Sequence, residues 1–139
     1  MSYTAVRGGT VYGVSGFSNH LIILCSEPMF YRVTGTKAVL SVNVSSWHES
    51  SPSNDDSCIL NEGDHKFIKH KSFCFYQRAV PLNVLKLEDK VDKGEMKDYG
   101  MLRPDVFKRV LEGFEKSPVL SREAANFIQL LKKNGFEWP

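Results

Sequence analysis

The chain has 139 residues, of which 42% are hydrophobic and 24% charged, a balance typical of one globular domain spanning residues 1–139. The formal net charge of +2 permits contact with nucleic acid without indicating it, because dedicated nucleic-acid-binding domains are usually more basic. Residues 1–9 lack the apolar centre of a signal peptide, and no run approaches the ~18 apolar residues of a membrane span. We therefore expect a cytoplasmic protein without membrane contact.

Three cysteines, Cys25, Cys58 and Cys74, form an odd set without a Cys-x-x-Cys pair. Each of them stands next to an apolar residue, which is a setting typical of buried free thiols. We expect structural thiols, and neither a disulfide framework nor a cofactor.

Short apolar and β-branched runs predict strands through most of the chain. The expected strands are Thr10–Val14, Leu21–Cys25, Lys37–Trp47, Cys58–Leu60, Ser72–Leu82 and Leu82–Leu87. Ser72–Leu82 alternates aromatic and polar side chains and is expected to be one long strand, which Pro81 ends or places at the sheet edge. Ser15–Asn19 is expected to be a loop, Glu49–Ser57 a solvated, mobile loop, and Glu88–Asp98 a charged connector.

Two amphipathic helices are predicted at the end of the chain. Pro104 suits the first position of the first helix, because its missing N–H would have no partner there. Ser121 is the expected N-cap of the second helix, which Gly135 ends. Strands followed by helices, without strand–helix alternation, predict a mainly β fold. We expect a β-barrel or curled antiparallel sheet over residues 1–100 and a helical segment over residues 101–139.

Several motifs follow one another along this pattern. A glycine-containing loop, Gly16–His20, precedes the apolar run Leu21–Ser26, and the β-branched strand Val42–Ser46 ends in a pair of hydroxyl residues. Ser72–Arg78 begins with serine, and Gly100–Leu102 leads into the first helix. In this order of motifs the chain resembles the MazF/PemK toxin-like superfamily, which includes the Kid and CcdB toxins.

The stretch Gly63–His70, which reads Gly-Asp-His-Lys-Phe-Ile-Lys-His, is similar to a motif of an uncharacterised, phage- and prophage-associated branch of these proteins. The resemblance extends over about Gly9 to Phe114 and implies an SH3-like curled β-barrel, commonly a homodimer. Nuclease members of the family cut single-stranded RNA without metal, and a short antitoxin protein fills their cleft. The resemblance implies the same activity and partners here.

Two positions depart from the pattern of the nuclease members. Those members carry arginine followed by proline before the second strand, where this chain has Asn19-His20. They carry threonine followed by serine where this chain has Ser45-Ser46. The catalytic arginine of the family therefore has no counterpart here, and a toxin of the gyrase-poison type or an inactive relative stays open.

Metal-free cleavage of RNA needs a base for the 2′-hydroxyl, an acid for the leaving 5′-oxygen and donors around the phosphate. Imidazole suits both proton transfers, because it titrates near neutral pH. The resemblance places His20 where the family's catalytic side chain projects, and we predict His65 or His70 as its partner. Ser45 and Ser46 are the predicted phosphate donors, and strand order is expected to bring Ser45 and His20 to one groove. Strand capping by His20 and the serines, and a plain turn at His65, are the structural alternatives.

Substrate contacts are predicted at five further positions: Asn19, Trp47, Lys69, Lys71 and Arg78. The cations would hold phosphate, and Trp47, which we expect to be half exposed, would stack on an unpaired base. Alternatively, the lysines form a solvated surface and Arg78 pairs with a carboxylate. Asp64, His65 and His70 have metal-ligand chemistry, but their spacing is irregular, so we expect no metal.

Three functions fit these residues. The first is a metal-independent endoribonuclease of a toxin–antitoxin system. The second is a non-catalytic binding toxin that acts through a dimer face and the C-terminal helices, which the missing arginine favours. The third is an accessory interaction protein of a phage or mobile element.

Overall fold

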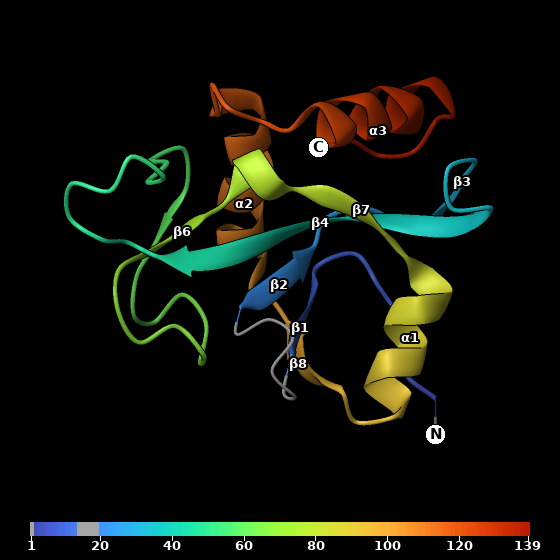
Figure 1. The fold of residues 1–139 in the computed structure, drawn as a ribbon, viewed down its shortest axis with the longest axis horizontal. Coiled ribbons are helices and arrows are strands. Elements are labelled where there is room, and N and C mark those ends of the chain that lie inside the picture. Colours follow the sequence, from blue (N-terminus) through green and yellow to red (C-terminus); the bar gives the residue numbers. More distant parts are fainter. Residues whose placement is uncertain (1, 14–19) are drawn as a thin grey trace.

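The computed structural model describes residues 2–13 and 20–139, which form one antiparallel sheet of eight strands with three α-helices around it (Figure 1). The strands are β1 (Gly9–Gly13), β2 (Leu21–Leu24), β3 (Met29–Tyr31), β4 (Thr36–Ser46), β5 (Ile59–Leu60), β6 (Ser72–Cys74), β7 (Val80–Asn83) and β8 (Met96–Met101). The helices are α1 (Val84–Asp92), α2 (Pro104–Lys116) and α3 (Arg122–Lys133). The prediction of a mainly β fold with two C-terminal helices is confirmed.

Strand β4 is the central strand of the sheet. It pairs with β2 and β3 along one edge and with β6 and β7 along the other. Leu40 and Val42 point into the larger hydrophobic cluster, beneath α2 and α3, whereas Val39 points into a smaller cluster with Val84 and Leu87 of α1. Because both faces of β4 are covered, its middle is buried on both sides and is apolar except for Ser41, whose hydroxyl donates a hydrogen bond to the Val80 carbonyl oxygen.

The sheet is open at its two ends. The strand order is β5-β6-β4-β2-β1-β8, and within residues 2–13 and 20–139 no pairing joins β5 to β8. The described part of the chain is therefore an open antiparallel sheet and not a closed barrel.

The predicted long strand Ser72–Leu82 is wrong, because the chain breaks it with a 3-10 turn at Tyr76–Arg78 between β6 and β7. Both flanking strands pair with the same edge of β4. Cys74 lies opposite Val44 and Val80 lies opposite Ser41. The segment between Cys74 and Val80 thus contains more residues than the segment between Ser41 and Val44 of β4. The additional residues leave the sheet and form the 3-10 turn.

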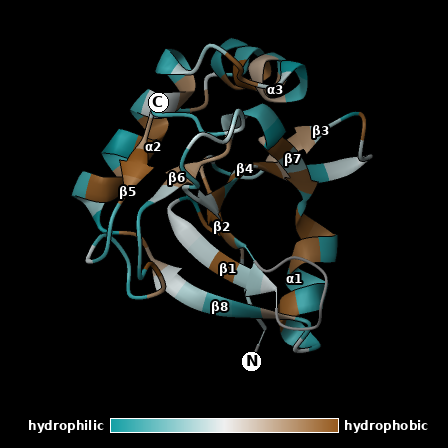
Figure 2. Ribbon diagram, turned by 60° about the vertical axis from the view of Figure 1, so that its left-hand side comes forward, coloured by the Kyte–Doolittle hydropathy of each residue, from teal (hydrophilic) through white to brown (hydrophobic). Residues whose placement is uncertain are grey.

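Helix α1 and strand β8 differ from the sequence-based expectation of a strand at Leu82–Leu87 and a connector at Glu88–Asp98. The side chain of Asn83 accepts a hydrogen bond of 3.1 Å from the Lys86 N–H and so caps α1. After α1 the chain returns as β8, which pairs with β1 at the edge of the sheet (Figure 2). Exposed residues dominate β8 and leave no clear alternation in its sequence.

Helices α2 and α3 carry the signals predicted for them. Pro104 is at the start of α2, and the Ser121 hydroxyl accepts a hydrogen bond of 3.1 Å from the Ala124 N–H at the start of α3. Gly135 follows α3 with φ of +77°, the left-handed conformation that glycine adopts at a helix end. None of the helices in the described ranges combines the length and apolarity needed to cross a membrane.

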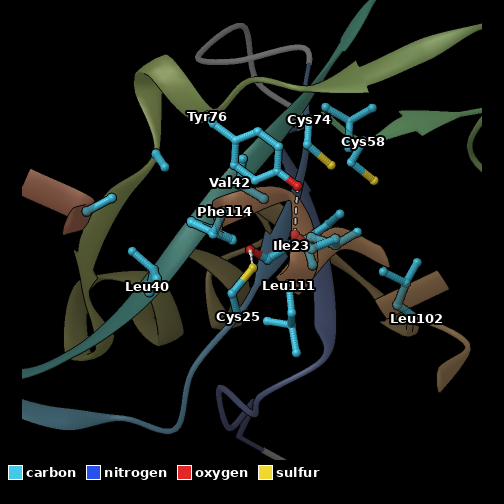
Figure 3. Packing of buried hydrophobic residues seen from close by; sticks show 14 of the residues in the cluster. Ile23, Cys25, Leu40, Val42, Cys58, Cys74, Tyr76, Leu102, Leu111 and Phe114 are labelled. Carbon is cyan, nitrogen blue, oxygen red and sulfur yellow. Dashed lines mark hydrogen bonds between the residues drawn. The ribbon is translucent and has the colours of Figure 1, made fainter. Parts of the chain in front are cut away.

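The three cysteines are buried free thiols, as predicted. They lie in the larger cluster, near the ring of Tyr76 (Figure 3). Burial raises the pKa of Cys25, and a hydrogen bond with Cys58 together with burial raises the pKa of Cys74. The thiols of Cys25 and Cys74 are therefore poor nucleophiles, which favours a structural role for these two cysteines, whereas the same hydrogen bond lowers the pKa of Cys58.

The loop Glu49–Ser57 contains no helix or strand, as predicted, but it is not fully solvated. Asp55 is buried and accepts a hydrogen bond of 2.7 Å from the Ser117 hydroxyl at the end of α2. It also accepts from the Ser57 N–H at 2.9 Å. These bonds compensate for burying a carboxylate and attach the loop to the helix.

Candidate functional site

A cavity of about 610 Å³ lies between the ends of β2 and β4 and the loop 61–71. Its polar lining residues are His20, Ser45, Ser46, Lys66, Lys69, His70 and Ser72. Leu21, Phe67 and Tyr99 contribute apolar and aromatic surface. His20 and Ser45 thus share one groove, as the strand order predicts.

A hydrogen bond from its imidazole ring fixes His20 directly before the start of β2. Its Nδ1 donates a hydrogen bond of 3.1 Å to the carbonyl oxygen of Val44, which faces Leu21 across the β2–β4 pairing. A carbonyl oxygen can only accept, so the proton of the neutral ring is on Nδ1. The other nitrogen, Nε2, keeps its lone pair and can accept a proton.

His70 forms a pair with Ser46, the last residue of β4. The Ser46 hydroxyl and His70 Nε2 are 2.7 Å apart. The hydroxyl of Ser72, which pairs with Ser46 in the sheet, donates a hydrogen bond of 2.9 Å to the His70 carbonyl oxygen. Two serines from neighbouring strands therefore fix the ring and the backbone of an otherwise exposed histidine.

The charge of the cavity is positive. Lys66 and Lys69 line it, and no Asp or Glu of the described residues does. Lysine ammonium groups without a carboxylate between them favour an anionic ligand, and hydroxyl groups add donors for its oxygens. Phosphate esters meet both requirements.

His65 points away from this cavity. The Phe67 N–H donates to its Nδ1 at 3.0 Å, so its proton is on Nε2, 3.2 Å from the Thr10 hydroxyl. That hydroxyl in turn donates to the Gly100 carbonyl oxygen at 2.8 Å. Both ring nitrogens are thus occupied in the neutral form, and burial lowers the pKa of His65. This geometry favours a structural role for His65 over proton transfer.

Asp64 does not orient His65. Its carboxylate accepts from the Asn61 N–H at 2.8 Å and from Arg109 of α2 at 2.9 Å. Asp64 and His65 therefore anchor the loop 61–71, while Lys66, Lys69 and His70 present their side chains to the cavity. The stretch Gly63–His70 divides into residues that anchor the loop and residues that face the cavity.

The remaining predicted contacts lie elsewhere. Lys71 Nζ lies 4.2 Å from the ring centre of Trp47, which is half buried as expected, and neither residue lines the cavity. The Arg78 guanidinium carbon lies 5.3 Å from the ring centre of Phe75, so its partner is an aromatic ring. Asn19 lies outside the described residues. In the ranges 2–13 and 20–139 no three His, Cys, Asp or Glu side chains form a group suited to a metal ion.

No protein-family model matches the sequence, and no curated protein is similar to it. The resemblance to MazF/PemK toxins therefore stays a prediction, and the cavity has to be interpreted from its own chemistry. Sequence reasoning missed Lys66, Phe67 and Tyr99. The first two lie inside the recognised Gly63–His70 motif, and β8, which carries Tyr99, had no strand signal.

Proposed function

We propose that the protein is a metal-independent endoribonuclease that cleaves single-stranded RNA in the cavity between β4 and the loop 61–71. The observation that carries the proposal is the pair of imidazoles, His20 and His70, lining a cavity with two lysines and no described carboxylate. One acceptor nitrogen, two cations and two hydroxyl groups match the needs of phosphodiester transfer.

In the proposed reaction the 2′-oxygen of the substrate attacks the adjacent phosphorus. His20 Nε2 takes the proton of the 2′-hydroxyl, and protonated His70 donates a proton to the departing 5′-oxygen. The bond from phosphorus to the 5′-oxygen breaks, which leaves a 2′,3′-cyclic phosphate and a 5′-hydroxyl. Lys66 and Lys69 offset the negative charge that develops on the phosphate oxygens.

The proposal includes the family context. It takes over from the resemblance of the sequence motifs an SH3-like arrangement of the MazF/PemK type, a homodimer, cytoplasmic action and inhibition by a short antitoxin protein. In this proposal the imidazole of His20, one residue after the position of the family's arginine, takes the place of its guanidinium.

The test uses a labelled RNA oligonucleotide of mixed sequence in excess EDTA. Wild-type protein is expected to cut it to products that carry 2′,3′-cyclic phosphate. His20→Ala and His70→Ala are each expected to lower the rate by about a hundredfold or more, the usual contribution of acid–base catalysis. His48→Ala, at an exposed histidine outside the cavity, is the matched control. Full activity of both cavity variants would refute this mechanism.

A non-catalytic interaction protein is the second candidate. Phe30 of β3 is 64% exposed and Val33, in the turn that follows, is 79% exposed. Both belong to the hairpin of β3 and β4, and exposed apolar side chains on one hairpin are a surface that a partner protein can cover. Growth arrest on expression with intact cellular RNA, abolished by Phe30→Ser, would favour this candidate over the nuclease.

A further inference from the structure

A second hollow, of about 390 Å³, lies beside the proposed catalytic cavity. It is formed by the turn 63–66 and residues 99–103. Lys66 and Tyr99 line both hollows, so these two side chains form the boundary between them. A ligand that extends out of the catalytic cavity past Tyr99 enters the second hollow.

The ring of Tyr99 is held in place and flanked by positive charge. Its centre lies 5.5 Å from the ring centre of Phe67 and 6.1 Å from that of Tyr12. Lys66 Nζ and Lys97 Nζ lie 5.5 Å and 5.8 Å from the Tyr99 ring centre. An aromatic ring beside lysines is the combination with which proteins bind a base and its phosphate in single-stranded nucleic acid.

The arginine that lines the second hollow, beyond Lys66 at its boundary, is compensated by carboxylates. Arg103 pairs with Asp105 at 3.1 Å, lies 4.0 Å from Asp64 and donates to the Gly63 carbonyl oxygen at 2.7 Å. A phosphate gains little from an arginine already paired with carboxylates. An uncharged nucleobase fits such a hollow better, because its binding does not depend on an unpaired cation.

We propose that the second hollow is a base-binding subsite for a nucleotide next to the cleaved one. The base stacks on Tyr99, and Lys66 and Lys97 contact the phosphate that links the two nucleotides. This inference rests on the proposed function, since it places the cleaved nucleotide in the neighbouring cavity. It assigns Tyr99 a binding role and requires a substrate longer than one nucleotide.

The subsite can be tested without any cleavage by using an oligonucleotide whose 2′-O-methyl groups prevent cleavage. Fluorescence anisotropy measures how tightly the protein binds it. Tyr99→Leu is expected to weaken binding about tenfold or more, the effect of losing one base–aromatic stack. Tyr99→Phe is expected to bind within about twofold of wild type, because the ring is kept. Phe136→Leu, at a partly buried aromatic residue outside both hollows, is the matched control and should bind like wild type.

A scan with one abasic nucleotide at each position separates stacking from a general loss of structure. At one position the abasic ligand is expected to weaken binding to wild type and to have no further effect on Tyr99→Leu. Equal losses of affinity in wild type and in Tyr99→Leu at every abasic position would overturn the proposed subsite. Absence of binding to wild type would overturn it as well. Binding with the expected pattern, but without cleavage of unmodified RNA, would support the subsite and refute only the nuclease.

Discussion

The hydroxyl of Tyr76 donates a hydrogen bond of 2.6 Å to the backbone carbonyl oxygen of Val110, in the middle of α2. The tyrosine is fully buried, and its ring packs edge-on against Phe114 at 4.8 Å between centres. The bond is drawn in Figure 3. It joins the 3-10 turn between β6 and β7 to the helix that covers the sheet, and it requires the helix backbone to approach the ring closely.

Gly113 of α2 makes this approach feasible. A Cβ atom at this position would collide with the hydroxyl and ring of Tyr76. Alanine normally stabilises a helix interior by about 1 kcal/mol relative to glycine. Here we expect Gly113→Ala to lower the free energy of unfolding by about 1–3 kcal/mol, as overpacking does. Urea unfolding followed by circular dichroism measures the change.

Tyr76→Phe serves as the companion variant. Removal of the hydroxyl is expected to cost about 1 kcal/mol for the lost hydrogen bond. The collision with ring carbons persists in the double variant, so Gly113→Ala should still destabilise it. A stabilising effect of Gly113→Ala in either background would show that the helix and the ring are not in contact.

Acid should destabilise the fold through His65. Burial lowers the pKa of His65 below its usual value of 6.5. Below pH 6.5 the unfolded chain therefore binds a proton that the folded protein resists, so stability falls as pH falls through this range and levels off below the folded-state pKa. Urea midpoints at pH 7.5 and 5.5 should differ more for wild type than for His65→Gln. His48→Gln, at an exposed histidine, should keep the wild-type dependence, and an unchanged difference in His65→Gln would contradict the prediction.

Ser46 is expected to position His70. Ser46→Ala removes the 2.7 Å contact with Nε2, and a misplaced proton donor lowers the cleavage rate by about tenfold to a hundredfold. The ¹⁵N chemical shifts of the His70 ring should change at the same time, which a loss of general stability would not produce. Ser53→Ala, on an exposed loop, is the control. An unchanged His70 spectrum would show that the serine does not hold the ring.

Lys69 is expected to bind RNA through the charge of its ammonium group. Each lysine that neutralises a phosphate adds about 0.7 to the slope of log K against log salt for a single strand. Lys69→Gln is therefore expected to weaken binding to all sequences alike and to reduce the slope by about that amount. Lys108→Gln, exposed on α2 away from the cavity, should leave the slope unchanged. If the slope for Lys69→Gln equals that for wild type, Lys69 does not contact a phosphate of the RNA.

Sequence predicted best what local chemistry determines. Pro104, Ser121 and Gly135 mark the limits of α2 and α3 through interactions within a few residues. The break at Tyr76 depends instead on pairing of the flanking strands with β4. The alternation of aromatic and polar residues in Ser72–Leu82 does not reveal that this segment has more residues than the stretch of β4 with which it pairs.

The same division holds for the candidate site. Strand order was sufficient to place His20 and Ser45 at one groove, because β2 and β4 pair next to each other. The direction of His65 depends on Thr10, a partner 55 residues away in sequence. Tyr99 was missed because β8 is defined by its pairing with β1 and not by its own residues.

The Arg109 guanidinium contacts both the Asp64 carboxylate, at 2.9 Å, and the Ile59 carbonyl oxygen, at 3.1 Å. Helix α2 is thereby fastened to the segment that ends in His70. Displacing this helix would remove the arginine partner of Asp64 and loosen that end of the segment, while Ser46 and Ser72 would still hold the other end at His70. A molecule bound to α2, outside the groove, would thus act on the loop that forms one wall of the groove.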